Sequence, residues 1–222
     1  KGFGYWDGVS DQIIFFNHPE AHLPDSRFND GAVGPAGNFW AGTMYQGLAT
    51  DRPAPGSLYR LHPDENVRLI QPDLTISNGL GWSPDKTRFY HTDTLHHTIY
   101  RYDFDPVRGE ASNRRVFVHD LDQPGVPDGL TVDSQGFVWS ARWGGWKITR
   151  YDPDGIPERG IELPVECPTS CTFGGADLNQ LYITSAWTAL TPEQRTVQPQ
   201  AGDLFRIEFN DITGQPANHF LG

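Results

Sequence analysis

The stretch Asn78-Gly79-Leu80-Gly81-Trp82, followed by Phe89-Tyr90-His91-Thr92-Asp93 and Ile99-Tyr100-Arg101-Tyr102, decides the fold. Its short apolar and alternating segments, separated by turn residues, predict antiparallel β-strands. The same arrangement starts again at Asn29-Asp30-Gly31 and at Asp128-Gly129, which lie 49 residues before and 50 residues after Asn78. Short strands repeated at this period are typical of a β-propeller, in which each four-stranded blade buries its faces against its neighbours.

The copies of this repeat predict the strands one by one. Three complete copies predict strands over 29–33, 39–43, 58–61 and 67–70, then 78–82, 89–93, 99–102 and 115–118, then 128–132, 137–141, 148–151 and 160–163. A fourth copy predicts strands over 170–173, 181–184 and 204–207, with an insertion at 191–200, and the start of the chain holds two strands, 3–6 and 13–16. The chain therefore supplies about four and a half blades, and we expect residues 1–222 to form a single, partial propeller domain.

Composition excludes several classes of protein. The chain has 222 residues, 37% of them hydrophobic, which is enough for a sizeable core. It contains no apolar run of the length that a membrane helix needs. The formal charge of −11 and the absence of a basic patch argue against binding to nucleic acid. We expect a small-molecule partner, and neither a nucleic acid nor a membrane.

Cys167 and Cys171 are the two cysteines of the chain. Two thiols make no disulfide framework and cannot complete a structural zinc site alone. We interpret them as small buried residues in a reducing compartment, and a cytoplasmic location is the corresponding expectation. The chain begins at Lys1 and not at Met, and we expect N-terminal residues of the ring to precede it.

The first strand of each blade lines the central channel of a propeller. The residues at the heads of these strands are Asn29, Asn78, Asp128 and Ser170. Polar residues that recur at this one place converge in space although they are far apart in the sequence. The mouth of the channel is therefore the predicted functional site.

Five segments together resemble the regucalcin–gluconolactonase family of six-bladed propellers. They are Arg27-Phe28-Asn29-Asp30-Gly31, Phe39-Trp40-Ala41-Gly42-Thr43-Met44, Ile76-Ser77-Asn78-Gly79-Leu80-Gly81-Trp82-Ser83, Pro127-Asp128-Gly129-Leu130 and Pro168-Thr169-Ser170-Cys171-Thr172-Phe173-Gly174-Gly175. The resemblance implies an all-β six-bladed propeller that hydrolyses a sugar lactone and holds one divalent metal ion at the channel mouth.

The same resemblance implies roles for particular residues. It makes Asn78 and Asp128 metal ligands, and it makes Arg27 and Asn29 contacts of the substrate. The family's third ligand, a Glu in its first blade, has no counterpart in this chain. About 70 residues, or one and a half blades, would have to precede Lys1 to complete the six.

The oxygen donors of Asn78 and Asp128 suit Ca²⁺, Mg²⁺ or Mn²⁺, and also accept Fe²⁺ or Zn²⁺. Asn-Gly and Asp-Gly are equally ordinary turn dipeptides. In lactone hydrolysis the metal would polarise the ring carbonyl, and Arg27 would help to stabilise the oxyanion. Asp128 is the candidate general base, and a metal-bound hydroxide is the alternative nucleophile.

Two other functions share these motifs. One is a calcium-binding regulatory propeller without significant turnover, and the other is a broader lactonase or esterase. The sequence leaves the sugar, its place in carbohydrate metabolism, the metal and the oligomeric state open.

Three further groups of residues are interpreted as structural. Trp143 and Trp146 are expected to pack between blades, although exposed indole faces also suit sugar rings. The spacing of His91, His96 and His97 matches no zinc motif and indicates a solvated loop. Neither Ser170 nor Cys171 carries the context of a catalytic nucleophile.

Overall fold

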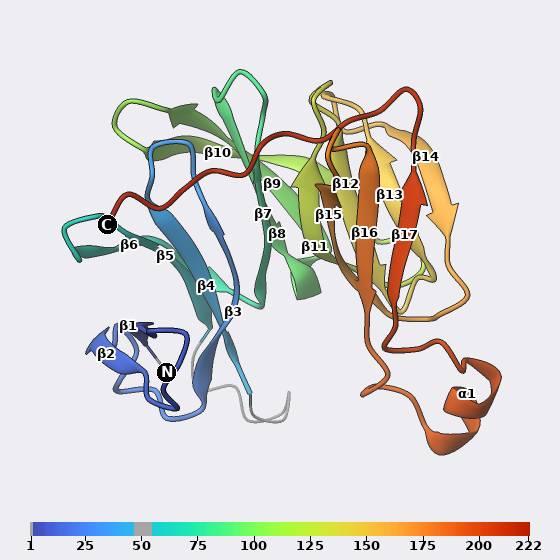
Figure 1. Ribbon diagram of the computed structural model, residues 1–222, viewed down its shortest axis with the longest axis horizontal. Helices are drawn as coiled ribbons and strands as arrows, with labels where there is room; N and C mark the ends of the chain where they lie inside the picture. Colours follow the sequence, from blue (N-terminus) through green and yellow to red (C-terminus); the bar gives the residue numbers. More distant parts are fainter. Residues whose placement is uncertain (1, 47–54) are drawn as a thin grey trace.

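The computed structural model describes residues 2–46 and 55–222, and these consist almost entirely of antiparallel β-strands (Figure 1). Three sheets have four strands each, paired in sequence order, as propeller blades do. Blade A contains β3 (Ser26–Val33), β4 (Phe39–Tyr45), β5 (Gly56–Leu61) and β6 (Val67–Leu74). Blade B contains β7 (Ser77–Trp82), β8 (Arg88–Asp93), β9 (Thr98–Asp105) and β10 (Glu110–His119). Blade C contains β11 (Val126–Val132), β12 (Val138–Trp143), β13 (Lys147–Tyr151) and β14 (Pro157–Glu162).

Two smaller sheets complete the strands. Blade D contains β15 (Pro168–Gly174), β16 (Gln180–Ser185) and β17 (Leu204–Glu208), and the start of the chain forms a two-stranded sheet of β1 (Phe3–Tyr5) and β2 (Ile14–Asn17). Every predicted strand is present. The expectation of six blades is not confirmed, because the described residues form four blades and this separate pair. The pair packs on blade A through Phe3, which lies in one cluster with Ala41, Tyr59 and Leu61.

Within residues 2–46 and 55–222, helical structure is confined to two short segments. The 3-10 turn η2 (Thr94–His96) joins β8 to β9, and α1 (Pro192–Val197) lies in the insertion that the repeat predicted. Thr191 and Gln194 form a capping box around Pro192, which explains why a helix starts there. No helix within the described ranges is long and apolar enough to cross a membrane.

The blades pack face to face around a central hollow, and β3, β7, β11 and β15 are successive neighbours along it. Aromatic residues of alternate positions fill the space between blades A and B, where Trp40, Trp82 and Phe89 belong to one buried cluster. Their rings approach to centroid distances of 4.9 Å between Trp82 and Phe89 and 6.0 Å between Trp40 and Trp82. Truncating one such side chain to alanine typically costs about 3–5 kcal/mol, so these contacts fix how neighbouring blades are oriented.

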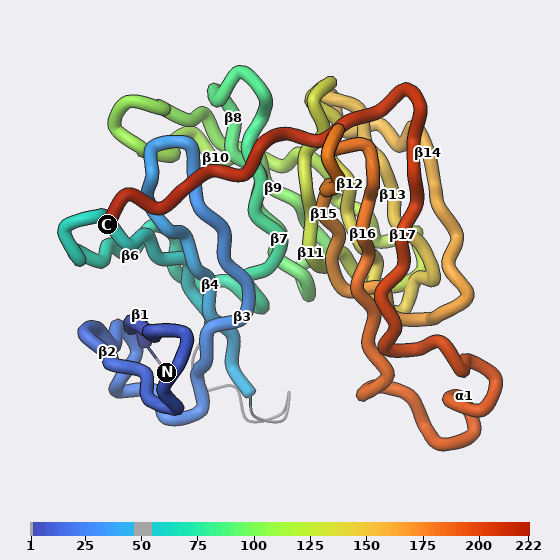
Figure 2. The backbone as a smooth tube through the Cα atoms, in the orientation of Figure 1, coloured from blue at the N-terminus to red at the C-terminus, as the bar shows by residue number. Residues whose placement is uncertain are grey.

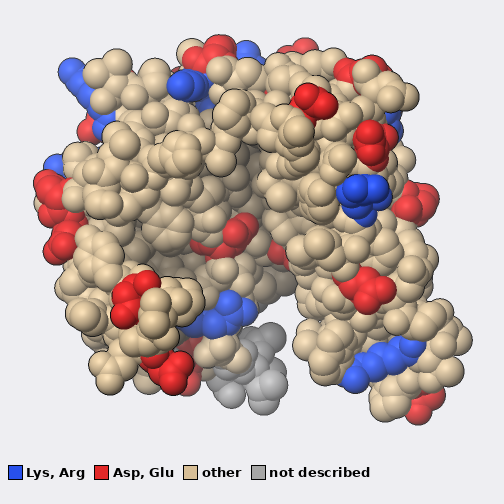
Figure 3. Space-filling model, in the orientation of Figure 1, with Lys and Arg blue, Asp and Glu red and all other residues tan. Residues whose placement is uncertain are grey.

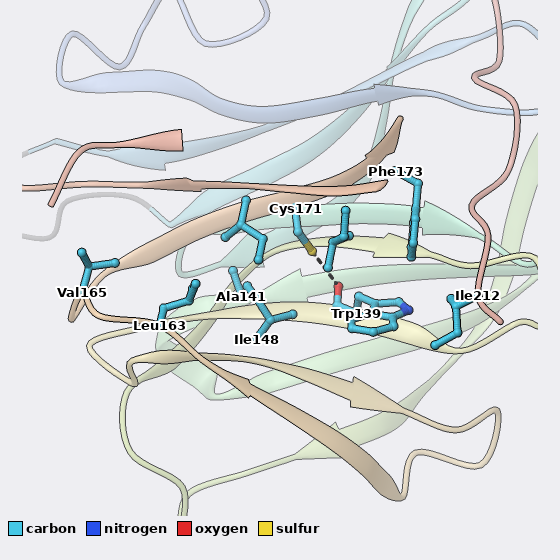
Figure 4. Packing of buried hydrophobic residues seen from close by; sticks show 10 residues of the cluster. Trp139, Ala141, Ile148, Leu163, Val165, Cys171, Phe173 and Ile212 are labelled. Atoms are coloured by element: carbon cyan, nitrogen blue, oxygen red, sulfur yellow. Dashed lines mark hydrogen bonds between the residues drawn. The ribbon is translucent and has the colours of Figure 1, made fainter. Parts of the chain in front are cut away.

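Cys171 lies in the corresponding cluster between blades C and D (Figure 4). Its Sγ is 3.6 Å from the carbonyl oxygen of Trp139, and burial raises the pKa of the thiol to about 12. Cys167 is also buried, and neither cysteine forms a disulfide. The interpretation of both as buried thiols is confirmed, and Cys171 cannot supply a thiolate near neutral pH.

The last residues, 209–222, form a strap across the hollow that the sequence did not predict (Figure 2). The Nε2 of Gln215 donates hydrogen bonds to the carbonyl oxygens of Trp82, at 3.0 Å, and Val132, at 3.1 Å. The Nδ2 of Asn218 donates to the carbonyl oxygen of Val33 at 3.0 Å. These three carbonyls end β7, β11 and β3, so the strap ties three blades together at the end of the hollow opposite the strand heads.

Candidate active site at the heads of the central strands

A β-bulge interrupts each central strand near its head. The pairing register shifts between Phe28 and Gly31 in β3, between Asn78 and Leu80 in β7, and between Pro127 and Leu130 in β11. A bulge leaves residues unpaired and changes the direction of their side chains. In blades A to C the bulge lies at or beside Asn29, Asn78 and Asp128, so the same local irregularity affects the direction of these three side chains.

The glycines after Asn78 and Asp128 allow these strands to approach closely. A Cβ on Gly79 would lie 2.7 Å from the carbonyl oxygen of Asp128, and one on Gly129 would collide with the hydroxyl of Ser170. Neither glycine has a positive φ. The Asn-Gly and Asp-Gly dipeptides are therefore not turns here. They serve close packing between neighbouring strands.

Asn78 and Asp128 come together at the heads of β7 and β11. The side chain of Asn78 is 7% exposed, and its Nδ2 donates a hydrogen bond to Thr94 Oγ1 at 3.2 Å. The Asn78 side chain also lies close enough to the carboxyl group of Asp128 to lower its pKa. Two residues that are fifty positions apart thus share one polar contact, as their place in the repeat predicted.

The pKa of Asp128 is raised to about 7, mainly by burial. The negative charge of Asp30 raises it further. Hydrogen bonds from the Asn78 side chain and the Gly129 amide act in the opposite direction. Burial also raises the pKa of Asp30, while the amide of Gly31, 2.7 Å from Asp30 Oδ1, lowers it. A partly buried pair of carboxyl groups favours either a shared proton or a bound cation.

Asp30 is the site residue that the sequence analysis missed. It follows the head residue Asn29, and the corresponding positions after Asn78 and Asp128 are glycines. The available signal was a carboxylate at a position where the other copies of the repeat have glycine. In the structure Asp30 lies on the wall of a cavity of about 1000 Å³ in the central hollow. The other walls of this cavity are the later parts of β7, β11 and β15 and the strap, and Asn78 and Asp128 do not line it. Figure 3 shows acidic side chains at the bottom of this hollow.

Arg27 and Asn29 lie beside this group on β3. Arg27 Nη1 donates to Asn29 Oδ1 at 3.1 Å and to the carbonyl oxygen of Phe28 at 2.9 Å. Asn29 Nδ2 donates to the carbonyl oxygen of Ser77, at 3.1 Å, next to Asn78. The structure therefore places both predicted substrate contacts near the predicted metal ligands, and Asn29 links blade A to blade B.

One of the three histidines, His91, differs from the expectation of a solvated loop, whereas His96 is exposed in a turn as expected. His91 is fully buried in β8, with Nε2 2.7 Å from Ser77 Oγ, and burial lowers its pKa to about 4. Packing between blades, which the local sequence does not reveal, buries this ring and keeps it neutral. His96 lies in η2 with Nδ1 2.7 Å from Asp93 Oδ2.

The residues that could hold a metal are few. Residues 2–46 and 55–222 contain no cluster of three or more His, Cys, Asp or Glu side chains suited to a metal ion. The site instead offers the carboxylates of Asp30 and Asp128 with the amide of Asn78. Such a set of oxygen donors fits a hard divalent cation. No Lys, Arg or His side chain is among the described groups that act on the pKa of Asp30 or Asp128.

The chain is similar to known proteins over most of its length. A family model described as SMP-30/Gluconolactonase/LRE-like region matches residues 1–187. Regucalcin of Oryctolagus cuniculus is 39% identical over 204 residues, 89% of this chain and 67% of that protein. Pentonolactonase XacC of Haloferax volcanii is 40% identical over 202 residues, 88% of this chain and 67% of that protein. The crystal structure of a calcium-binding protein, regucalcin, from Agrobacterium tumefaciens superposes with a TM-score of 0.89 at 31% identity, over 99% of this chain and 73% of that one.

Proposed function

Because this chain belongs to the SMP-30/gluconolactonase/LRE-like family, we propose that it is a carboxylic-ester hydrolase that opens a sugar lactone to the sugar acid with one divalent metal ion. The observation that carries the proposal is the meeting of Asn78, Asp128 and Asp30 at the head of the hollow. The similarity to a pentonolactonase supports a sugar lactone as substrate. Cytoplasmic action in carbohydrate metabolism remains a prediction.

Asn78 and Asp128 are the proposed metal ligands, and we add Asp30 to them. The metal, when bound, acts as a Lewis acid that polarises the lactone carbonyl. The oxygen donors favour Ca²⁺, Mg²⁺ or Mn²⁺ over Fe²⁺ or Zn²⁺. A bound cation would balance the charge of the two neighbouring carboxylates in place of a shared proton, which is the physical reason for assigning the metal there.

Asp128 is the proposed general base. Burial raises the pKa of Asp128 to about 7 in the absence of a cation, and a bound cation would lower it again. The proposal of Asp128 as base therefore rests on its place in the site, beside the position of the lactone carbonyl. Asp128 takes a proton from a water molecule as the water oxygen bonds to the carbonyl carbon. The carbonyl then re-forms, the ring C–O bond breaks, and the leaving alkoxide takes up the proton from Asp128.

Arg27 and Asn29 are the proposed substrate contacts. The guanidinium of Arg27 uses Nη1 for Asn29 and Phe28, and its planar fork carries further donors for lactone or hydroxyl oxygens. A cation beside the carbonyl also stabilises the negative charge that develops on its oxygen.

A calcium-binding protein without significant turnover is the second candidate. The similarity to a structure described as a calcium-binding protein favours it, and it would use the same oxygen donors. A broader lactonase or esterase is a third possibility that shares the site.

Lactone hydrolysis followed in a pH-stat, with and without a chelator, tests these functions. The substrates are a hexonolactone, a pentonolactone and a simple alkyl ester. We expect metal-dependent turnover of a sugar lactone that Asp128→Ala abolishes and that Asp122→Ala, at an exposed acid of the neighbouring loop, leaves unchanged. Calcium binding without turnover would establish the second candidate, and neither binding nor turnover would refute the proposal.

A further inference from the structure

Thr94 is the residue that holds the side chain of Asn78. It begins η2, directly after β8, and is only 5% exposed. Its hydroxyl oxygen accepts the hydrogen bond from Asn78 Nδ2, at 3.2 Å. Its amide donates to the carbonyl oxygen of Ile76 at 3.1 Å, so the turn is attached to the segment that leads into Asn78.

A buried polar group fixes this turn in place. Asp93 Oδ1 accepts hydrogen bonds from the amide of Thr75, at 2.9 Å, and from the Thr75 hydroxyl, and the amide of Leu95 donates to Thr75 Oγ1 at 3.0 Å. Asp93 is 1% exposed. Because these bonds join the segment before β7 to the end of β8, the hydroxyl of Thr94 has a defined position relative to Asn78.

An asparagine binds a cation only through Oδ1, since Nδ2 carries two donor protons. In the structure Nδ2 is bonded to Thr94, while Oδ1 is 3.3 Å from the amide of Gly79. A threonine hydroxyl both donates and accepts hydrogen bonds, so it can hold either end of the amide. A valine of the same shape could hold neither.

We propose that Thr94 is a positioning residue for the metal ligand Asn78, and that its hydroxyl keeps the Asn78 amide in place both without and with a divalent cation. The hydrogen bond from Nδ2 to Thr94 leaves Oδ1 as the atom that would reach a cation. The inference rests on the proposed function because it takes Asn78 as a ligand.

Calcium titration by calorimetry tests it on the purified chain, with Ca²⁺ as the probe. Thr94→Val is expected to weaken Ca²⁺ binding about two- to tenfold, the loss expected for one hydrogen bond. Thr94→Ser keeps the hydroxyl and is expected to stay near the unaltered chain. Thr149→Val is the control, because Thr149, in β13, is also a buried threonine but its hydroxyl has no partner within the described residues.

The outcomes separate the inference from the function beneath it. Normal Ca²⁺ affinity in Thr94→Val, together with loss of binding in Asp128→Ala, overturns the role of Thr94 alone. Equal Ca²⁺ affinity in Asp128→Ala and the unaltered chain, or no Ca²⁺ binding at all, overturns the metal site and the inference together.

A second measurement needs no variant of Thr94, in case Thr94→Val does not fold. The side-chain ¹⁵N resonance of Asn78, assigned by its absence in Asn78→Asp, should show slowly exchanging protons and should shift when Ca²⁺ is added. Rapid proton exchange would show that no stable hydrogen bond holds the Asn78 amide. An unchanged resonance at saturating Ca²⁺ would show that Asn78 is not a ligand of the cation. Either result overturns the inference.

Discussion

Replacing Asp128 by asparagine should stabilise the metal-free protein at pH 8 while it removes lactone hydrolysis. Burial and the charge of Asp30 raise the pKa of Asp128 from its ordinary value of 3.8 to about 7. A group with a raised pKa stabilises the folded state fully below the unfolded pKa, and this contribution is lost as the pH rises through the folded pKa. At pH 8 the ionised carboxylate of Asp128 therefore destabilises the folded protein.

The size of the effect follows from the shift. The pKa of Asp128 rises from 3.8 to about 7, and because each pKa unit corresponds to about 1.4 kcal/mol, the upper limit is about 4 kcal/mol. Asp128 retains some contact with solvent, which reduces the expected gain in the free energy of unfolding to about 1–3 kcal/mol. The advantage of Asp128→Asn should shrink between pH 8 and pH 5, because the folded wild-type carboxyl group becomes protonated over that range.

Urea unfolding with a chelator present, at pH 5 and pH 8, measures this difference. Turnover of a sugar lactone by the same variant should fall about 10²- to 10⁴-fold, as expected for the loss of a general base. Asp122→Asn, at an exposed position, is the control for charge alone and should change neither quantity. A variant that is less stable than the wild type at pH 8, or that turns over lactone normally, would refute the reasoning.

Three further variants test what holds the site in place. Arg142→Met should lower the free energy of unfolding in urea by about 3–5 kcal/mol, because buried Arg142 pairs with Asp120 at 2.8 Å and binds the carbonyl oxygens of residues 123–125; a loss below 1 kcal/mol would contradict this. Gly129→Ala should lower both thermal stability and Ca²⁺ affinity, since its Cβ would collide with Ser170, and unchanged affinity would show that the close approach of the strands is unimportant. Gln215→Ala should cost about 1–3 kcal/mol in urea unfolding, because two strand-end carbonyls lose their donor, while lactone turnover in the folded variant stays normal; a loss of turnover would place the strap in the site.

The sequence by itself determined the strands and their order. Alternation of apolar and polar residues and the turn residues between them act locally, so a repeat such as 78–102 gives the position of each strand directly. The repeat also identified Asn78 and Asp128, because equivalent positions of a repeated fold occupy equivalent places. The capping box at Thr191 and Gln194 was visible in the sequence too, although the helix it starts was not predicted.

Only the tertiary structure decided which side chains meet. The interaction of Asp30 with Asp128, the burial of His91 and the bonds of Gln215 to two blades all join residues that are remote in the chain or depend on a neighbouring blade. Whether Asp30 faces the hollow depends on the bulge in β3, and a bulge reverses the alternation from which the sequence analysis reasoned. The pKa of Asp128 depends on the solvent that packing removes and on charges that packing brings near. The local sequence pattern contains neither the extent of burial nor the position of distant charges. The pKa of Asp128 could therefore be obtained only from the folded chain.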